Sequence, residues 1–262
     1  MTESSGELVG YAVSGGVATV TLDSPANRNA LSQELMSQLS DRLGAAQQDG
    51  AVRVIVLAHT GRVFCSGMDL TEARGAGSSD MGVRAFPTVL QTIWDSPKPV
   101  VGRIAGPARA GGLGLVAACD LAVCVRAATF AFTEVRLGLI PAVISATVLP
   151  RLDPRAAHEL FLTGAVFDGV RAAEIGLVNA AVGQDELDTA TAAYVADLVK
   201  GGPKALAATK DLLRRTRSAT MADDFAELLQ TSAAFFASEE GQEGIRAFGE
   251  KRAPRWIPAG SD

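Results

Sequence analysis

Short apolar runs alternate with polar segments in the first part of the chain. Residues 17–22 (VATVTL), 52–58 (VRVIVLA) and 98–104 (KPVVGRI) are rich in β-branched residues, and Gly, Pro or polar residues bound each run. Branched side chains fit a pleated, half-buried surface, so each run predicts a β-strand. One small, polar, glycine-rich stretch, 75–80 (GAGSSD), predicts a mobile loop.

The segment between the first two runs has the spacing of a helix. Its leucines recur every fourth residue at Leu31, Leu35, Leu39 and Leu43. This period places them on one face of an amphipathic helix. Ser32 is suited to cap the start of that helix, and Gly50 to close its end. Strand, helix and strand in this order predict right-handed crossover connections and an α/β core.

The pattern changes in the second half of the chain. Residues 121–125 and 129–132 are predicted strands, and the remainder of the chain is mainly helical. Asp153-Pro154 and Gly202-Pro203 are typical helix starts, because proline fits the first helical position. Strand signals almost vanish between 185 and 249. We expect the helices there to form a separate layer or an assembly surface.

The composition is that of a globular protein with one large core. The chain has 262 residues, of which 48% are hydrophobic and 20% charged, which argues against disorder. Its net charge of −5 and pI near 5.2 argue against a nucleic-acid surface, which needs an excess of Lys and Arg. Without a leader-like start or a long uncharged apolar run, the expected location is the cytoplasm, away from membranes.

The cysteines and histidines do not have the spacing of metal ligands. Cys65, Cys119 and Cys124 stand among apolar neighbours and are predicted to be buried thiols. The histidines are His59, expected in a loop after a strand, and His158, expected within a helix. A serine-type catalytic triad would need a serine to meet one of them by chance, so we expect neither a triad nor a metal site.

Two small-residue turns are placed to present unpaired backbone amides. RAGGLGLVAACD (109–120) follows one predicted strand and opens a helix, and VFCSGMDL (63–70) follows another strand. The first amides of a helix have no intrahelical partner and attract an anionic oxygen. Neither stretch has the spacing of the common nucleotide motifs. Two such turns are instead able to aim two N–H groups at one oxygen, as in an oxyanion hole.

Six segments in order resemble the crotonase, or enoyl-CoA hydratase/isomerase, superfamily. They are SPANRNAL, VFCSGMDL, IAGPARAGGLGLVAACDLAV, FAFTEVRLGLIP, LTGAVFDGVRAAEIGLVN and FGEKRAPRW. The resemblance implies an α/β fold, a crotonase-like spiral of ββα units with a C-terminal helical trimerisation region. We expect the spiral core over residues 1–195, the helical region over 196–262, and a homotrimer or a hexamer made of two trimers.

The resemblance also implies the site residues. The amides of Met68 and Gly111 match the positions that hold the carbonyl oxygen of an acyl-CoA thioester, and Glu134 matches a catalytic carboxylate. Apolar neighbours should raise the pKa of Glu134, as acid–base catalysis near neutral pH requires. The alternative is a surface ion pair between Glu134 and Arg136. Asp120 is expected to be a structural cap or strand-start partner.

The coenzyme A part of the substrate needs partners of its own. We predict that it is bound by Arg28, Ser66, Asp69 and Lys251. Arg109 and Arg252 are further candidates for its phosphates, although a solvated salt-bridging surface explains such cations almost as well. Coenzyme A then arrives as part of the thioester, and no separate cofactor is expected.

The departures from the family pattern bear on the reaction. Typical hydratases read GGG-x-E in the second turn, but this chain has Ala110 at the first glycine and Gly114 at the glutamate. Glu134 is then the single catalytic carboxylate. The sequence slightly favours an enoyl-CoA hydratase, and the alternative is a 3,2-enoyl-CoA isomerase. A non-catalytic acyl-CoA binder and a thioester hydrolase remain alternatives.

Overall fold

The computed structural model describes residues 6–72 and 78–258, without the side chains of 78–83. The strands are β1 (Val9–Ser14), β2 (Val17–Leu22), β3 (Val54–His59), β4 (Val100–Ile104), β5 (Ala108–Arg109), β6 (Leu121–Val125), β7 (Thr129–Ala131), β8 (Phe167–Asp168) and β9 (Ala180–Val182). The α-helices are α1 (Gln33–Gln48), α2 (Ser78–Trp94), α3 (Gly111–Ala118), α4 (Ala142–Val148), α5 (Pro154–Thr163), α6 (Gly169–Glu174), α7 (Leu187–Lys200), α8 (Pro203–Arg214), α9 (Met221–Ala237) and α10 (Glu239–Gly249). The 3-10 helices are η1 (Pro25–Asn27), η3 (Glu134–Leu137) and η4 (Gln184–Glu186).

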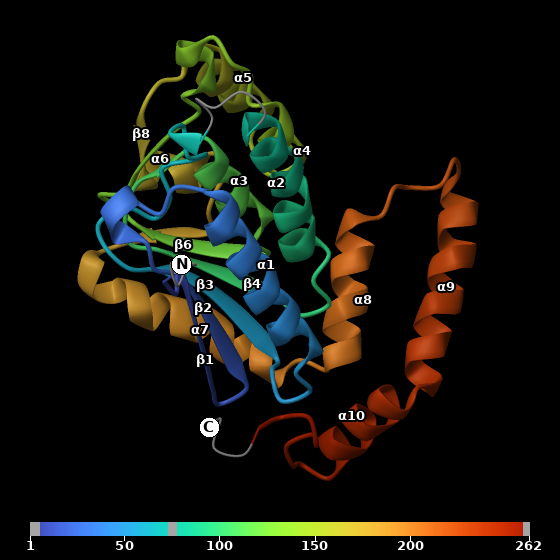
Figure 1. Cartoon of the computed structure of the whole chain (residues 1–262). Helices are drawn as coiled ribbons and strands as arrows, with labels where there is room; N and C mark the ends of the chain where they lie inside the picture. Colours follow the sequence, from blue (N-terminus) through green and yellow to red (C-terminus); the bar gives the residue numbers. More distant parts are fainter. Residues whose placement is uncertain (1–5, 73–77, 259–262) are drawn as a thin grey trace.

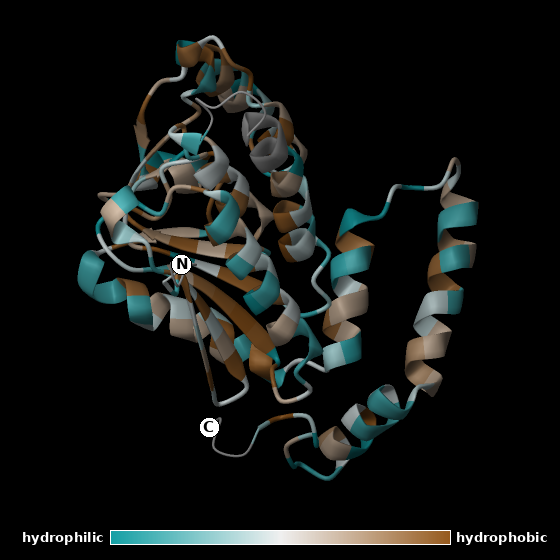
Figure 2. Cartoon of the chain, in the orientation of Figure 1, coloured by the Kyte–Doolittle hydropathy of each residue, from teal (hydrophilic) through white to brown (hydrophobic). Residues whose placement is uncertain are grey.

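A six-stranded sheet in the order β1-β2-β3-β4-β6-β9 forms the body of the molecule (Figure 1). β1 and β2 are antiparallel, and the other pairs are parallel. Every residue of β3 is buried, which is typical of a parallel strand covered on both faces. Helix α7 packs on β3, β4 and β6, and α1 packs on β1 and β2. The hydrophobic colouring of Figure 2 follows these central strands.

A second, three-stranded sheet has the order β5-β7-β8. Strand β4 of the large sheet leads to β5 of the small sheet and then to α3, and β6 leads to β7 and then, through η3, to α4. The turn after β3 joins the same arrangement, because Cys65 forms an isolated bridge with Ala108 of β5. Successive turns of strand, short strand and helix confirm the predicted spiral of ββα units.

Most of the predicted elements are present with shifted ends. Ser32 caps α1 as predicted, since its hydroxyl accepts a hydrogen bond from the Leu35 amide at 3.2 Å. The helix begins at Gln33 and ends at Gln48, with Asp49 at its C-cap in place of the predicted Gly50. Leu31 lies outside the helix, so its place in the leucine repeat was misleading. Of the predicted loop at 75–80, residues 75–77 lie outside the described ranges. The remaining residues, from Ser78 on, belong to α2.

The C-terminal helices extend from the body (Figure 1). The expected boundary between residues 195 and 196 falls inside α7, which continues to Lys200. Helix α8 begins at Pro203 as predicted. It is tied to the sheet by a partly buried ion pair, Lys210 Nζ to Asp120 Oδ2 at 2.6 Å. The same oxygen accepts from the Val100 amide, so Asp120 has the structural role expected of it.

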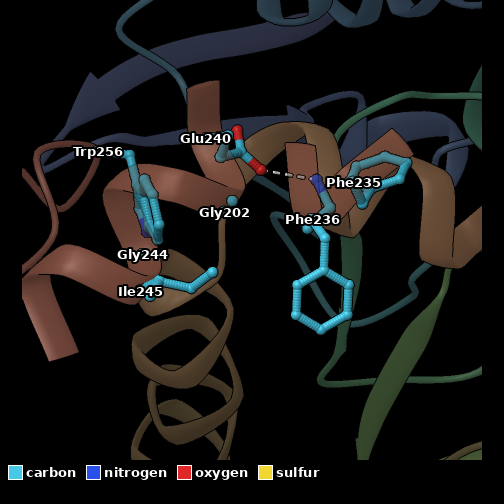
Figure 3. A pocket seen from close by; sticks show the side chains of 9 residues that line it. Gly202, Phe235, Phe236, Glu240, Gly244, Ile245 and Trp256 are labelled. Carbon is cyan, nitrogen blue, oxygen red and sulfur yellow. Dashed lines mark hydrogen bonds between the residues drawn. The ribbon is translucent and has the colours of Figure 1, made fainter. Parts of the chain in front are cut away.

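Helices α9 and α10 lie beyond α8, away from the sheet (Figure 1). An apolar cavity of about 360 Å³ lies among α8, α9 and α10, and Figure 3 shows the side chains that line it, Trp256, Ile245 and Phe235 among them. Glu240 caps the start of α8 there, accepting from the amides of Lys204 and Ala205. In the described part of the chain after β9, all regular structure is helical, in agreement with the loss of strand signals.

Candidate active site

The first turn of the site follows the carboxyl end of β3. Two backbone hydrogen bonds join it to the segment before α1: Leu31 N to Gly67 O at 2.8 Å and Asp69 N to Leu31 O at 3.3 Å. Met68 lies between these bonds in a parallel bridge with Leu31. In such a bridge the amide of the central residue points away from its partner. The Met68 N–H is therefore directed away from Leu31.

The second turn follows β5 and opens α3. Ala110 precedes the helix with φ of 47° and ψ of −117°, and its amide donates to the Ala131 carbonyl at 3.2 Å. Gly111 is the first helical residue, so its amide has no carbonyl four residues earlier to bind. Among the described residues, neither this amide nor that of Met68 donates a hydrogen bond.

The two turns are in direct contact. A Cβ atom built on Gly67 would lie 3.5 Å from the Gly111 nitrogen. Bond lengths then place the Met68 and Gly111 nitrogens within about 8 Å of each other. A Cβ on Gly112 would lie 2.7 Å from the Cys65 carbonyl oxygen. Glycine is needed at position 112 because the two backbones approach so closely.

Apolar side chains line the start of α3. A Cβ on Gly111 would meet Leu31 Cδ1 at 2.8 Å and the Phe86 ring at 3.3 Å. Leu31 and Phe86 are both buried. Hydrogen bonds are stronger in such a low-dielectric setting than in water. An oxygen bound by the Gly111 amide would gain from this setting.

Glu134 begins η3, three residues beyond Ala131, which pairs with Arg109 in the small sheet. This pairing ties the segment of Glu134 to the turn that ends at Gly111. Its Oε2 atom is buried and has no hydrogen-bond partner within the described chain. Burial raises the pKa of the Glu134 carboxyl, opposed by a backbone hydrogen bond. The predicted direction of the pKa shift is confirmed.

Within the described residues, Glu134 does not form the alternative surface ion pair with Arg136. Arg136 Nε donates to the Thr163 carbonyl at 3.2 Å. Glu134 is half-buried, whereas Arg136 is exposed. The unpartnered oxygen of Glu134 is therefore free to bind a proton or a substrate atom.

Apolar side chains occupy the space beside Gly114, where typical hydratases have a second glutamate. A Cβ at this position would lie 2.6 Å from Ile144 Cγ2 and 3.4 Å from Leu90 Cδ2. Thr147 Oγ1 donates to the Gly114 carbonyl at 3.2 Å and fixes α4 against α3. Position 114 therefore has no carboxylate, and apolar side chains fill the space beside it. The contact of Ile144 with Gly114 depends on the packing of α4 on α3, which brings distant segments of the chain together.

The residues expected to bind coenzyme A are only partly brought together. Arg28 has a left-handed backbone, and its carbonyl accepts from the Ser66 amide at 3.1 Å. Its exposed guanidinium forms no ion pair with a described residue. Asp69 follows in the same turn, but its carboxylate accepts from the amide and hydroxyl of Thr71. Arg28, Ser66 and Asp69 thus lie around one turn.

Lys251 lies elsewhere in the chain. The segment after it returns to the beginning of β3, where Arg53 donates to the Trp256 carbonyl at 3.0 Å. The turn with Ser66 follows the opposite end of β3, about 20 Å away for a strand of this length. Within the described residues, no hydrogen bond or ion pair joins Lys251 to Arg28, Ser66 or Asp69; its amide donates to the Phe248 carbonyl.

The two additional cations already have protein partners. Arg109 donates to the carbonyls of Ala108 and Thr129 and to the Thr129 hydroxyl. Arg252 binds both carboxylate oxygens of Glu243, at 2.7 and 3.1 Å. These contacts occupy much of each guanidinium, so the phosphates of coenzyme A would have to compete for it.

Asn29 organises the first turn, a role that the sequence reasoning missed. It is fully buried. Its side chain accepts from the Ser24 amide at 2.7 Å and donates to the carbonyls of Thr60 and Val63. A buried polar side chain that bonds three separate backbone positions fixes them relative to one another. The motif SPANRNAL was the available signal.

The histidines and cysteines have structural places. His59 is the buried last residue of β3 rather than a loop residue. Its Nε2 accepts from the Ala105 amide at 3.0 Å, so Nδ1 carries the proton and donates to the Thr60 carbonyl. His158 Nδ1 lies 2.8 Å from the Pro154 carbonyl of its own helix. All three cysteines are buried, as predicted, and burial raises the pKa of the Cys65 thiol to about 12.

Neither a metal-binding group nor a membrane-spanning helix is present among the described residues. No group of three or more His, Cys, Asp or Glu side chains within these ranges is arranged to hold a metal ion. None of the helices that the structure describes is both long and apolar enough to cross a membrane.

The spiral of ββα units and the paired turns define a protein of the crotonase fold. The chain belongs to the enoyl-CoA hydratase/isomerase family, whose model matches residues 12–258. A solved enoyl-CoA hydratase from Mycobacterium smegmatis is 33% identical with a TM-score of 0.87, over 96% of this chain and 99% of that one. A solved enoyl-CoA hydratase from Mycobacterium avium is 44% identical with a TM-score of 0.73, over 96% and 99%. A carnitinyl-CoA dehydratase from Salmonella typhi is 32% identical over 250 residues, 92% of this chain and 95% of that protein.

Proposed function

We propose that this protein binds an acyl-CoA thioester and moves a proton on its acyl group, with Glu134 as the single acid/base. The observation that carries the proposal is the buried, unpartnered Oε2 of Glu134, together with the apolar filling beside Gly114. The amides of Met68 and Gly111 would hold the thioester oxygen. Coenzyme A enters and leaves as part of the thioester.

Isomerisation of a β,γ-enoyl-CoA to the α,β-enoyl-CoA is the reaction that this arrangement supports best. Ionised Glu134 removes a proton from the α-carbon, and the electron pair of the broken C–H bond forms a dienolate with its charge on the thioester oxygen. The two amides stabilise that charge where it develops. Protonated Glu134 then returns the same proton to the γ-carbon. One carboxylate is sufficient, and no other reactant is consumed.

Hydration of an α,β-enoyl-CoA is the second candidate. The relatives named enoyl-CoA hydratase and carnitinyl-CoA dehydratase support it. Hydration requires one group to activate water and a source for the proton that reaches the α-carbon. With Ile144 in place of a second carboxylate, Glu134 would have to do both through the same water molecule. This demand places hydration behind isomerisation.

Purified protein assayed separately with a β,γ-enoyl-CoA and an α,β-enoyl-CoA tests the proposal. We expect the first to be converted to its conjugated isomer faster than the second is hydrated. Faster hydration would make hydratase the function. Binding of both thioesters without turnover would show a non-catalytic binder, and release of free thiol, detected with a thiol reagent, would show a hydrolase.

The partners of the substrate and of the chain are further parts of the proposal. Arg28, Ser66 and Asp69 lie around the turn of Met68 and are proposed to contact the coenzyme A portion, while Lys251 would have to reach a site from a different place. We also propose a homotrimer, or a hexamer of two trimers, built through the C-terminal helices. A cytoplasmic location is part of the same proposal.

A further inference from the structure

The face of α3 that carries Gly111 also carries Gly114. Residues three apart lie on the same side of a helix. An acyl group whose thioester oxygen is bound at Gly111 therefore passes close to Gly114. With no side chain at Gly114, the neighbours of this position, Ile144 of α4 and Leu90 of α2, form the surface that the acyl group meets.

A groove of about 330 Å³ lies on the other side of these residues, between α2 and α4. Its wall includes Leu90, Trp94, Val143 and Thr147. Leu90 and Thr147 line the groove and also contact Gly114. Leu90 packs beside Gly114, and the Thr147 hydroxyl donates to the Gly114 carbonyl. The groove and the face of Gly114 are thus separated by one layer of side chains.

Ile144 belongs to that layer and is 3% exposed. We propose that Ile144, with Leu90, sets the length of the acyl chain that the site accepts, by closing the groove to the substrate. This inference rests on the proposed function. In the natural protein the layer confines the acyl group to a short segment beside α3. Removal of either side chain opens the groove, whose apolar wall can then cover further methylene groups.

Binding of two saturated thioesters, butyryl-CoA and decanoyl-CoA, tests the inference by calorimetry. Neither has a double bond, so the measurement does not depend on turnover. Each methylene group that is newly buried adds about fourfold in affinity. We expect Ile144→Ala to raise the affinity for decanoyl-CoA relative to butyryl-CoA by at least about tenfold over the natural protein. Leu90→Ala, on a different helix, should change the ratio in the same direction.

Val148→Ala is the matched control. Val148 is buried in α4, one turn after Ile144, and does not line the groove. Its ratio should stay within about twofold of the natural one, which is less than one methylene group contributes. An unchanged ratio in folded Ile144→Ala and Leu90→Ala, or an equal change in Val148→Ala, overturns the inference. If the natural protein binds neither thioester, the proposed function fails first, and the inference with it.

Discussion

At the scale of single residues, Glu134 is the group on which the proposed chemistry depends. Glu134→Gln keeps the shape of the side chain and removes its ability to accept a proton. We expect kcat for isomerisation to fall by about 10²–10⁴-fold, the usual contribution of a general base. Binding of a saturated acyl-CoA should be retained, which calorimetry checks. An unchanged kcat would assign the proton transfer to another residue.

The pH dependence follows from the direction of the pKa shift. Burial raises the pKa of Glu134, and the base must be ionised to remove a proton. The rate kcat/KM should therefore rise with pH through a pKa above that of an ordinary glutamate and level off higher. The stability changes in the opposite direction: the free energy of unfolding falls as pH rises from the ordinary glutamate pKa through the raised pKa, because the fold binds the proton more tightly than the unfolded chain does. Glu134→Gln should lose the rise in rate.

Ala110 is a second residue with a distinct expectation. Its φ of 47° lies in the region that favours glycine, where alanine is strained by about 1–2 kcal/mol. Glycine also costs backbone entropy on folding, about 0.4–1 kcal/mol. We expect Ala110→Gly to raise the free energy of unfolding in urea by about 0.5–1 kcal/mol, the difference between these effects.

Ala117→Gly in the interior of α3 serves as the control for Ala110. Ala117 is buried within the helix, and the same substitution there should lower stability by about 1 kcal/mol or more. A loss of stability in Ala110→Gly would show that the alanine methyl contributes packing that outweighs its backbone strain. That methyl lies 3.1 Å from where a Cβ on Gly67 would be.

The residues that could be predicted from the sequence are those held by local backbone geometry. The turn of Met68 follows directly from a strand end, and that of Gly111 opens a helix, so the two turns could be located from short motifs. The roles of the Met68 and Gly111 amides came from the family resemblance and stay predictions. Ile144 and Leu90 contribute side chains to the same place from α4 and α2. Their contact with Gly114 depends on how three helices pack, which no local pattern contains.

At the scale of elements, the packing of α4 on α3 decides what position 114 can hold. Gly114→Glu brings a Cβ to 2.6 Å from Ile144 Cγ2, and such overpacking costs about 1–3 kcal/mol. Ile144→Ala alone should cost about 2–5 kcal/mol through the cavity it leaves. Because each change relieves the other, we expect the double variant to lose less than the sum by at least about 1 kcal/mol. Urea unfolding of the four proteins measures this coupling.

A distant pair provides the control for that cycle. Val20 is a buried residue of β2, in the large sheet rather than against α3. Gly114→Glu and Val20→Ala should add within about 0.5 kcal/mol, as independent sites do. Equal coupling in both cycles would mean that position 114 acts through the whole fold and not through Ile144.

The elements also show where sequence patterns mislead. Leu31 continues the four-residue period of α1 and is fully buried like Leu35. It is nevertheless extended and forms a bridge with Met68. A buried position selects an apolar side chain whether the backbone is helical or extended, so hydrophobicity alone does not show which of the two Leu31 adopts. In the structure, its amide donates to the Gly67 carbonyl and not to a helical carbonyl. The predicted end of α1 was also shifted. Asp49, not Gly50, is the C-cap residue of this helix.

At the scale of the whole molecule, the C-terminal helices expose several large apolar side chains. Phe225, Leu229 and Phe236 of α9 are 65%, 70% and 66% exposed, and Phe248 of α10 is 89% exposed. Phe236 also lines the cavity of about 360 Å³ among α8, α9 and α10 (Figure 3). Large exposed apolar patches mark association surfaces. The loss of strand signals in the sequence predicted a helical region here, but not which face it would leave uncovered.

The proposed assembly follows from that face and can be broken there. Phe225→Lys combined with Leu229→Lys places two charges on the exposed side of α9. We expect the natural protein to sediment as a trimer or hexamer at micromolar concentration and the variant as a smaller species, because burying unpaired ammonium groups is strongly unfavourable. Thr231→Lys adds a charge on the opposite side of the same helix and should leave the assembly unchanged. A natural protein that sediments as a monomer, or equal dissociation by Thr231→Lys, would contradict this arrangement.

Thermal unfolding provides a second test of the assembly. Since association stabilises only the folded chain, the melting temperature of the natural protein should rise with its concentration, and that of the double variant should not.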